Sequence, residues 1–205
     1  MQLNATNISF RYRSGPWLFQ AMNLVINPGE IVGLTGPSGC GKTTFCKIIA
    51  GYEQAVEGEI SIDDQPLRRS GYNPVQLVFQ HPEKAVNPRW TMKRIVTEGW
   101  TQDKELLDLL GIQQEWLTRR PNELSGGELQ RFCVARALAP GTRYLIADEM
   151  TAMLDAITQA QIWHALQNIA RERKMGILVV SHEQPLIQRL CDRVVEMKGD
   201  GENES

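Results

Sequence analysis

The feature that most constrains this sequence is a glycine-rich segment, GPSGCGKT, at residues 36–43. It fits the pattern G-x-x-x-x-G-K-S/T and follows an apolar run at 30–35 that is typical of a buried strand. Residues 43–50 are expected to form a helix that ends at Gly51. Strand, glycine turn and helix in this order predict a loop whose backbone N–H groups point inward at phosphate oxygens.

Two side chains at the end of this loop carry chemistry. Lys42 would place a positive charge on the outer phosphates of a nucleotide, and we expect it in a solvated pocket. The hydroxyl of Thr43 could ligate Mg²⁺. The residues predicted to contact ATP in this segment are Gly36, Pro37, Ser38, Gly39, Cys40, Gly41, Lys42, Thr43 and Thr44.

The order of strands and helices predicts an α/β fold. Strands are expected at 6–12, 22–26, 30–35, 58–63, 75–79, 144–147, 177–180 and 193–197. Between them, 91–100, 104–110 and a segment starting near Ser125 have helical spacing. Alternation of this kind implies a mostly parallel sheet with helices on its faces. We therefore expect a P-loop NTPase core with an N-terminal antiparallel β subdomain and an inserted α-helical subdomain.

The domain organisation follows from the same pattern. Residues 1–205 are expected to form one domain, with the helical subdomain inserted at about 81–136. The polar segment 199–205 is expected to be a flexible tail.

Two carboxylates follow the apolar strand at 144–147. Asp148 and Glu149 would lie beside the glycine-rich loop, because ligands bind at the carboxyl edge of a parallel sheet. Asp148 could then hold Mg²⁺, directly or through water, and Glu149 could polarise an attacking water. By itself such a pair could equally cap a helix, so its value lies in the pairing with Lys42.

The segment LSGGELQR at 124–131 predicts a second anion site. Ser125 can cap a helix, and Glu128 three residues later completes a capping box. An ordinary cap does not need Gly126 and Gly127 in its first turn, where each glycine costs about 1 kcal/mol relative to alanine. We expect these glycines to expose backbone N–H groups at the helix start.

The composition excludes several other functions. A net charge of −2 without a concentrated basic face argues against nucleic acid as a partner. The apolar runs are too short to cross a bilayer, and the N-terminus lacks the apolar core of a secretion signal. The four cysteines have no metal-ligand spacing and are expected to be free thiols. A location in the cytoplasm is expected.

Taken together, the motifs resemble those of the ATP-binding cassette (ABC) family. LSGGE looks like its signature motif, Leu154-Asp155 like its D-loop, and Tyr12, 24 residues before Gly36, like its adenine-stacking aromatic. Gln80 looks like the Q-loop glutamine and His182 like the switch histidine. The resemblance implies Glu149, His182 and Gln80 as catalytic residues and Thr43, Gln80 and Asp148 as ligands of Mg²⁺. It also implies a second cassette, identical or related, whose bound ATP would be covered by Ser125, Gly126, Gly127 and Glu128.

A finer resemblance points to the oligopeptide, dipeptide and nickel importer ATPases. It rests on VFQHPE at 78–83, NPR at 87–89 and TQAQI at 158–162. It implies integral membrane permease subunits, an extracytoplasmic solute-binding protein and a position at the cytoplasmic face of the membrane. Two features depart from that group: Met150 and Met153 replace a proline and an alanine, and the C-terminal extension common there does not follow residue 205.

Two alternatives remain open from the sequence. One is a non-transport ABC ATPase that acts on nucleic acid or ribosomes, although no basic run or coiled-coil insertion supports it. The other is an accessory ABC-type subunit that binds ATP within a metabolic complex. The cargo itself is not encoded here, because cargo would contact other subunits.

Overall fold

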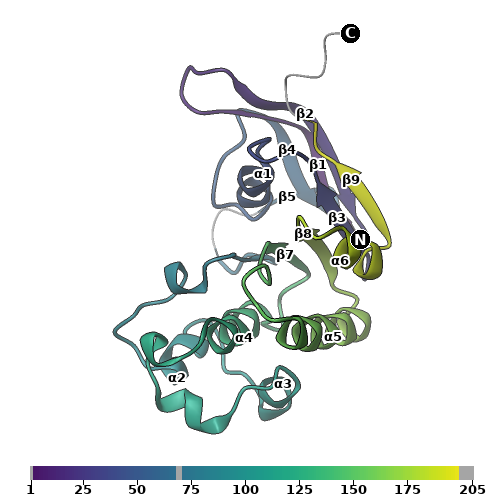
Figure 1. Ribbon diagram of the computed structural model, residues 1–205. Helices are drawn as coiled ribbons and strands as arrows, with labels where there is room; N and C mark the ends of the chain where they lie inside the picture. Colours follow the sequence, from purple (N-terminus) through teal and green to yellow (C-terminus); the bar gives the residue numbers. More distant parts are fainter. Residues whose placement is uncertain (1, 68–70, 199–205) are drawn as a thin grey trace.

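The computed structural model describes residues 2–67 and 71–198, which form two β-sheets and a group of helices (Figure 1). One sheet is antiparallel with the strand order β2-β1-β4-β5, and the other is parallel with the order β6-β7-β8-β3-β9. The strands are β1 (Leu3–Arg11), β2 (Trp17–Ile26), β3 (Ile31–Thr35), β4 (Glu57–Ile62), β5 (Gln65–Pro66), β6 (Val75–Val78), β7 (Tyr144–Asp148), β8 (Gly176–Val180) and β9 (Arg193–Glu196). The helices are α1 (Lys42–Ile49), α2 (Met92–Val96), α3 (Lys104–Leu109), α4 (Gly126–Ala137), α5 (Ala156–Arg173) and α6 (Gln184–Leu190), with 3₁₀ turns η1 (Pro82–Lys84), η2 (Gln114–Thr118) and η3 (Pro121–Glu123). The predicted α/β fold is confirmed.

The central strands of the parallel sheet, β3, β7 and β8, are buried on both faces, which explains why they are almost entirely apolar. On β8, Ile177 and Val179 belong to a core shared with α4 and α5. Leu178 and Val180 point to the opposite side and belong to a core shared with α1 and the antiparallel sheet. Successive residues of a strand face opposite sides, so a strand between two cores has no solvent-facing position for polar residues.

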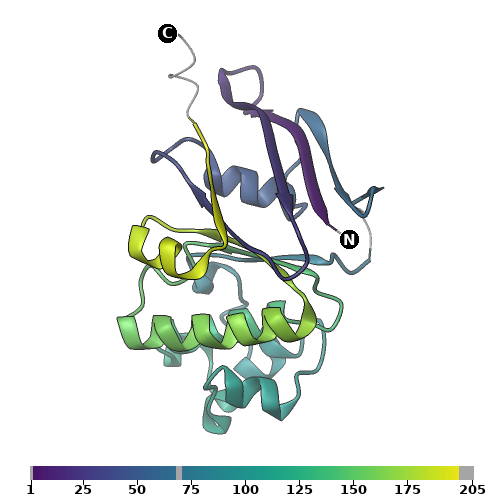
Figure 2. The same cartoon turned by 90° about the vertical axis from the view of Figure 1, so that its right-hand side faces the viewer.

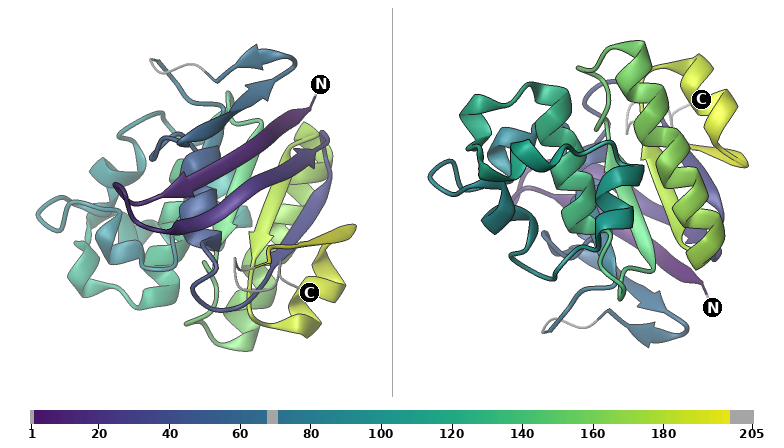
Figure 3. Two further views of the ribbon diagram at one scale, coloured as in Figure 1. Left: turned by 90° about the horizontal axis from the view of Figure 1, so that it is seen from above. Right: turned by 90° about the horizontal axis from the view of Figure 1, so that it is seen from below.

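Helix α1 lies between the two sheets (Figure 2). Its buried residues Phe45, Ile48 and Ile49 pack in the core that also contains Leu3 and Phe19 of the antiparallel sheet. Seen from above, the long strands of the antiparallel sheet cross over α1 (Figure 3). The start of α1 is thereby fixed from both sides, which matters because the glycine-rich loop leads directly into it.

The segment between β6 and β7 is helical, as expected, and α4 and α5 lie side by side on the far face of the parallel sheet (Figure 3). The helix predicted at 91–100 is shorter in the structure, where α2 ends at Val96. The side-chain amide of Gln102 donates to the carbonyl of Val96 and so satisfies the helix end. Gly99 is also unfavourable for a further turn.

Three further expectations concern single features. All four cysteines are free thiols, as predicted. No helix within 2–67 and 71–198 is both long and apolar enough to cross a membrane. The predicted tail at 199–205 lies outside the described residues.

Candidate nucleotide site

The glycine-rich loop connects β3 to α1 with backbone angles that require glycine. Gly36, Gly39 and Gly41 have φ values of 149°, 82° and 101°. A Cβ on Gly36 would lie 2.4 Å from the carbonyl oxygen of Met197, and one on Gly41 would lie 2.7 Å from the ring of Phe19. The loop therefore lies between β2 and the residue that follows β9. Gly36 and Gly41 are needed for both conformation and space, and Gly39 for conformation.

Lys42 differs from the expectation of a solvated pocket. Its side chain is only 7% exposed, and Nζ donates to the carbonyl oxygens of Gly36 and Pro37, each at 2.8 Å. The ammonium group thus folds back over the loop, where it takes two backbone acceptors in place of water. Sequence reasoning missed this contact, because the curl of the loop that offers the two carbonyls is a three-dimensional property.

The carboxyl end of β7 meets the start of α1. The hydroxyl of Thr43 donates to Oδ1 of Asp148 at 3.3 Å, although the residues are 105 positions apart. Burial raises the pKa of Asp148 above its ordinary value, and the carboxylate of Glu149 adds to the rise, while the bond from Thr43 opposes it. The predicted position of Asp148 beside the loop is the one observed, because both segments leave the same edge of the parallel sheet.

Gln80 lies near Thr43 and Asp148. A pocket of about 340 Å³ is lined by Thr43, Lys47, Phe79, Gln80, His81, Lys84 and Asp148. A hydroxyl, a carboxylate and an amide oxygen are the hard donors that suit Mg²⁺, which usually keeps several waters. The three predicted ligands therefore line one pocket, and the donor set fits this metal.

Glu149 adopts a backbone conformation that is unusual for a non-glycine residue. Its φ is 50°, in the left-handed region, and its backbone N–H donates to the carbonyl of Val180. Oε1 of Glu149 lies 2.8 Å from Nε2 of His182. Two of the predicted catalytic side chains are thus in direct contact just after the ends of the neighbouring strands β7 and β8.

Tyr12 lies at the end of β1, above the same helix start. Its ring is 62% exposed, and its hydroxyl is 3.1 Å from Oγ1 of Thr44. The ring of Phe10 supports it edge-on at a centroid distance of 5.0 Å. An exposed aromatic face next to the phosphate loop is what the predicted adenine contact requires.

The signature segment forms the helix start that its sequence predicts. Ser125 is the N-cap of α4: its Oγ accepts from the N–H of Glu128 at 3.3 Å, and the Glu128 carboxylate accepts from the N–H of Ser125 at 2.7 Å. A Cβ on Gly126 would meet nothing within 4 Å, whereas one on Gly127 would lie 3.1 Å from Thr158. Gly126 therefore leaves the helix end open, and Gly127 lets α4 approach α5.

The signature segment and the phosphate loop are not brought together within the chain. The signature residues line a separate pocket of about 460 Å³. Its described lining contains no residue of the phosphate loop and consists of Trp116, Ser125, Gly126, Gly127, Glu128, Arg131, Met153, Leu154, Asp155 and Thr158. Asp155 also caps α5, where it accepts from the N–H groups of Ile157 and Thr158. The predicted D-loop, Leu154-Asp155, thus borders the surface formed by residues 125–128, which we call the signature face.

Comparison with known proteins identifies the family to which these motifs belong. Residues 19–152, more than half of the chain, match the ABC transporter family. The nickel import system ATP-binding protein NikE of Staphylococcus aureus (strain N315) is 35% identical over 94% of this chain and 84% of the relative. The nickel import ATP-binding protein NikE of Shigella sonnei (strain Ss046) is 32% identical over 95% of this chain and 83% of the relative.

Solved structures give the same answer for the fold. The dimeric structure of a post-hydrolysis state of the ATP-binding cassette MJ0796 bound to ADP and Pi has a TM-score of 0.82 and 26% identity, and the match covers 97% of this chain and 96% of that one. A dimeric structure of MJ0796 described as a bacterial ABC transporter cassette has a TM-score of 0.80 and 26% identity, with 96% and 94% covered. The chain belongs to the ABC transporter family and is one of its ATP-binding, ATP-hydrolysing subunits.

Proposed function

We propose that this ATPase powers an importer whose cargo is nickel, as the ion or a chelate, or a peptide, and that Glu149 is the general base of hydrolysis. The observation that carries the chemistry is the contact between Thr43 and Asp148, which joins the phosphate loop to the last residue of β7, directly before Glu149. The names of the curated relatives favour nickel over peptides as the cargo.

ATP would bind along the path from Tyr12 to the start of α1. The exposed ring of Tyr12 would stack on adenine, and the N–H groups of residues 36–44 would surround the phosphates. The ammonium group of Lys42 would exchange its two carbonyl acceptors for phosphate oxygens. Thr43, Asp148 and Gln80 would hold Mg²⁺, which would neutralise charge that develops on the phosphates.

Glu149 and His182 would act together on the attacking water. A carboxylate has two oxygens, and Nε2–H of His182 would donate to Oε1 of Glu149. The other oxygen could then accept the proton of the water while His182 holds the carboxylate in place. Gln80, across the pocket from Asp148, would contact the same water or the γ-phosphate.

The signature face would serve the ATP of a second cassette. Its capped, glycine-opened helix end presents N–H groups apart from the phosphate loop of its own chain. Two cassettes paired head to tail would give each of these helix ends a γ-phosphate to bind. The partner would be a second copy or a related chain, and the dimeric cassettes of similar fold support such pairing.

An importer also needs membrane permease subunits and a solute-binding protein as partners of the ATPase. We place residues 1–205 in one ATPase domain whose helical subdomain, about 81–136, contacts integral membrane permease subunits. The chain would then lie at the cytoplasmic face of the membrane, and a solute-binding protein would deliver cargo from the other side. Nucleic acid is not proposed as a partner, since the charge balance does not favour it.

Uptake in cells tests this proposal. Cells that lack the chain, and cells that carry Glu149→Gln instead, should accumulate radioactive nickel at background level, while the wild-type chain should restore uptake. A labelled oligopeptide, measured in parallel, separates the two cargo classes. Unchanged uptake of both cargoes in the variant, with normal ATP hydrolysis by the purified wild-type chain, would contradict import and favour an accessory ATPase.

A further inference from the structure

One face of α4 holds the backbone of the segment that carries Gln80. Gln130 Nε2 donates to the carbonyl of Phe79 at 3.2 Å, and Arg136 Nη2 donates to the carbonyl of Ala85 at 2.8 Å. Between them, the thiol of Cys133 makes a long contact of 3.9 Å with the carbonyl of Pro82. We call Gln130, Cys133 and Arg136 the α4 ladder.

The spacing of the ladder matches on both sides. Its side chains come every three residues along α4, and the carbonyls that they reach, at 79, 82 and 85, also come every three residues. Residues three apart on a helix share a face, and the 3₁₀ turn η1 repeats every three residues. The segment 79–85 is therefore attached to α4 at both ends and in the middle, through its backbone rather than through replaceable side chains.

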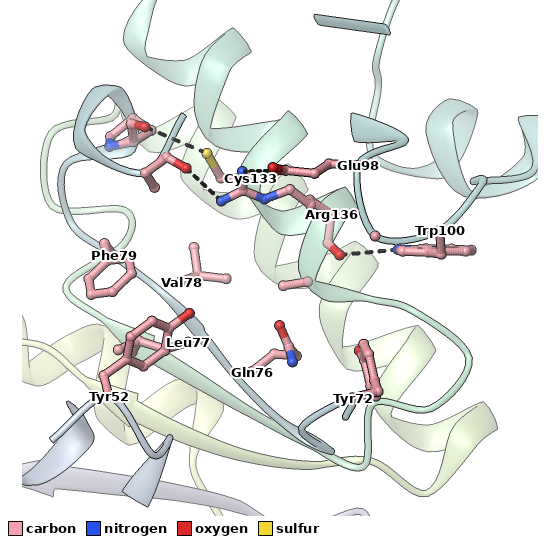
Figure 4. A pocket seen from close by; sticks show the side chains of 14 residues that line it. Tyr52, Tyr72, Gln76, Leu77, Val78, Phe79, Glu98, Trp100, Cys133 and Arg136 are labelled. Atoms are coloured by element: carbon pink, nitrogen blue, oxygen red, sulfur yellow. Dashed lines mark hydrogen bonds and ion pairs between the residues drawn. The ribbon is translucent and has the colours of Figure 1, made fainter. Parts of the chain in front are cut away.

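Figure 4 shows two members of this ladder, Cys133 and Arg136, at the wall of a pocket of about 360 Å³. Arg136 also pairs with Glu98 at 3.5 Å, and its own carbonyl accepts from the indole of Trp100 at 3.1 Å. Burial raises the pKa of Cys133 to about 11, so the thiol keeps its proton and remains a donor. Both the guanidinium group and the backbone carbonyl of Arg136 are thus held by neighbouring residues, so Arg136 is a rigid donor to the carbonyl of Ala85.

Gln130 is the ladder member whose bond lies next to Gln80, and a glutamine is unexpected at a position that is almost fully buried. Its side chain is 1% exposed, and Oε1 has no hydrogen-bond partner within the described part of the chain. A buried side-chain amide whose oxygen has no hydrogen-bond partner lowers the stability of the folded state compared with an apolar side chain of similar size. The side-chain bond that Gln130 makes goes to the carbonyl of Phe79, directly before Gln80, so the value of Gln130 lies in that position.

We propose that the α4 ladder consists of positioning residues that make Gln80 and the signature residue Ser125 move as one body. Ser125 caps the same helix little more than one turn before Gln130. Under the proposed function, on which this inference rests, Gln80 contacts the γ-phosphate of its own chain and Ser125 contacts that of the partner. A shift of Gln80 on ATP binding would then move Ser125 at the other site, so the ladder couples the two ATP sites.

The test compares ladder variants with a matched control. Gln130→Met and Arg136→Met each remove a donor but keep an unbranched side chain. Arg173→Met is the control, because Arg173 Nη1 donates to the carbonyl of Leu138 at 2.8 Å but does not touch 79–85. We expect the ladder variants to bind Mg-ATP normally, to lower kcat by about 3- to 30-fold and to reduce cooperativity in ATP. Arg173→Met should hydrolyse ATP like the wild type.

A double-mutant cycle with Gln80→Ala separates coupling from general loss of packing. Single-turnover hydrolysis of labelled ATP keeps slow residual rates measurable. If the ladder acts through Gln80, adding Gln130→Met to Gln80→Ala should cause no further loss. Additive losses, an equal loss in Arg173→Met, or a normal kcat in both ladder variants would overturn the inference and leave the proposed function standing. Absence of hydrolysis by the wild-type chain in its complex with the second cassette and the permease would overturn both.

Discussion

Glu149→Gln is expected to lower the rate of ATP hydrolysis by about 10²- to 10⁴-fold, the usual contribution of a general base, and to leave ATP binding intact. Glutamine keeps the shape of the side chain, and its amide can still contact His182, which lies 2.8 Å from Oε1 in the wild type. It cannot accept a proton from water at neutral pH. The substitution therefore separates the chemical step from the binding step.

The rate of phosphate release and the affinity for Mg-ATP, measured on the same preparation, check this expectation. Glu183→Gln is the matched control, because Glu183 follows His182 in the chain but its carboxylate accepts from Gln159 instead. The control should hydrolyse ATP at nearly the wild-type rate. A Glu149→Gln variant that turns over ATP normally would place the base at another residue.

Lys42→Ala is expected to weaken ATP binding by about 10- to 100-fold, because hydrogen bonds to a charged group are worth about 1.5–3 kcal/mol. In the wild type the ammonium group already lies over the loop, bound to the carbonyls of Gly36 and Pro37. Alanine would remove the positive charge and leave two loop carbonyls without their donor. Hydrolysis should fall with binding.

Isothermal titration calorimetry with Mg-ATP measures the loss of affinity in the variant. Lys104→Ala is the control, because it also removes one positive charge but lies at the start of α3, outside the phosphate loop. The control should bind like the wild type. Equal affinities for wild type and Lys42→Ala would show that the phosphates bind elsewhere.

Much of the fold could be predicted because the local signals agree with the tertiary structure. The apolar runs at 144–147 and 177–180 became the central strands β7 and β8, buried on both faces. The helix expected from Ser125 has the predicted capping box. Helix α2 is one exception, since the residue that satisfies its end, Gln102, lies beyond the range expected to be helical. Two others are β2, which begins at Trp17 rather than at residue 22, and α6, which was not expected.

The candidate site could be predicted in its membership but not in its internal contacts. Asp148 met the phosphate loop because parallel strands end at one edge of a sheet. The left-handed backbone of Glu149 and its contact with His182 depend on how two strand ends turn, which no residue type in the sequence signals. The burial of Lys42 was missed for the same reason: its acceptors are backbone carbonyls.

The dependence of ATP hydrolysis on protein concentration tests the central claim that a second cassette completes the active site. The specific activity of the purified wild-type chain should rise with its concentration, because the signature face and the phosphate loop line separate pockets. Gly126→Asp should abolish the rise, since its carboxylate would occupy open space at the α4 start and repel a phosphate, while favouring the helix itself. A specific activity that is constant with concentration and unaffected by Gly126→Asp would mean that one chain holds a complete site, contrary to this account.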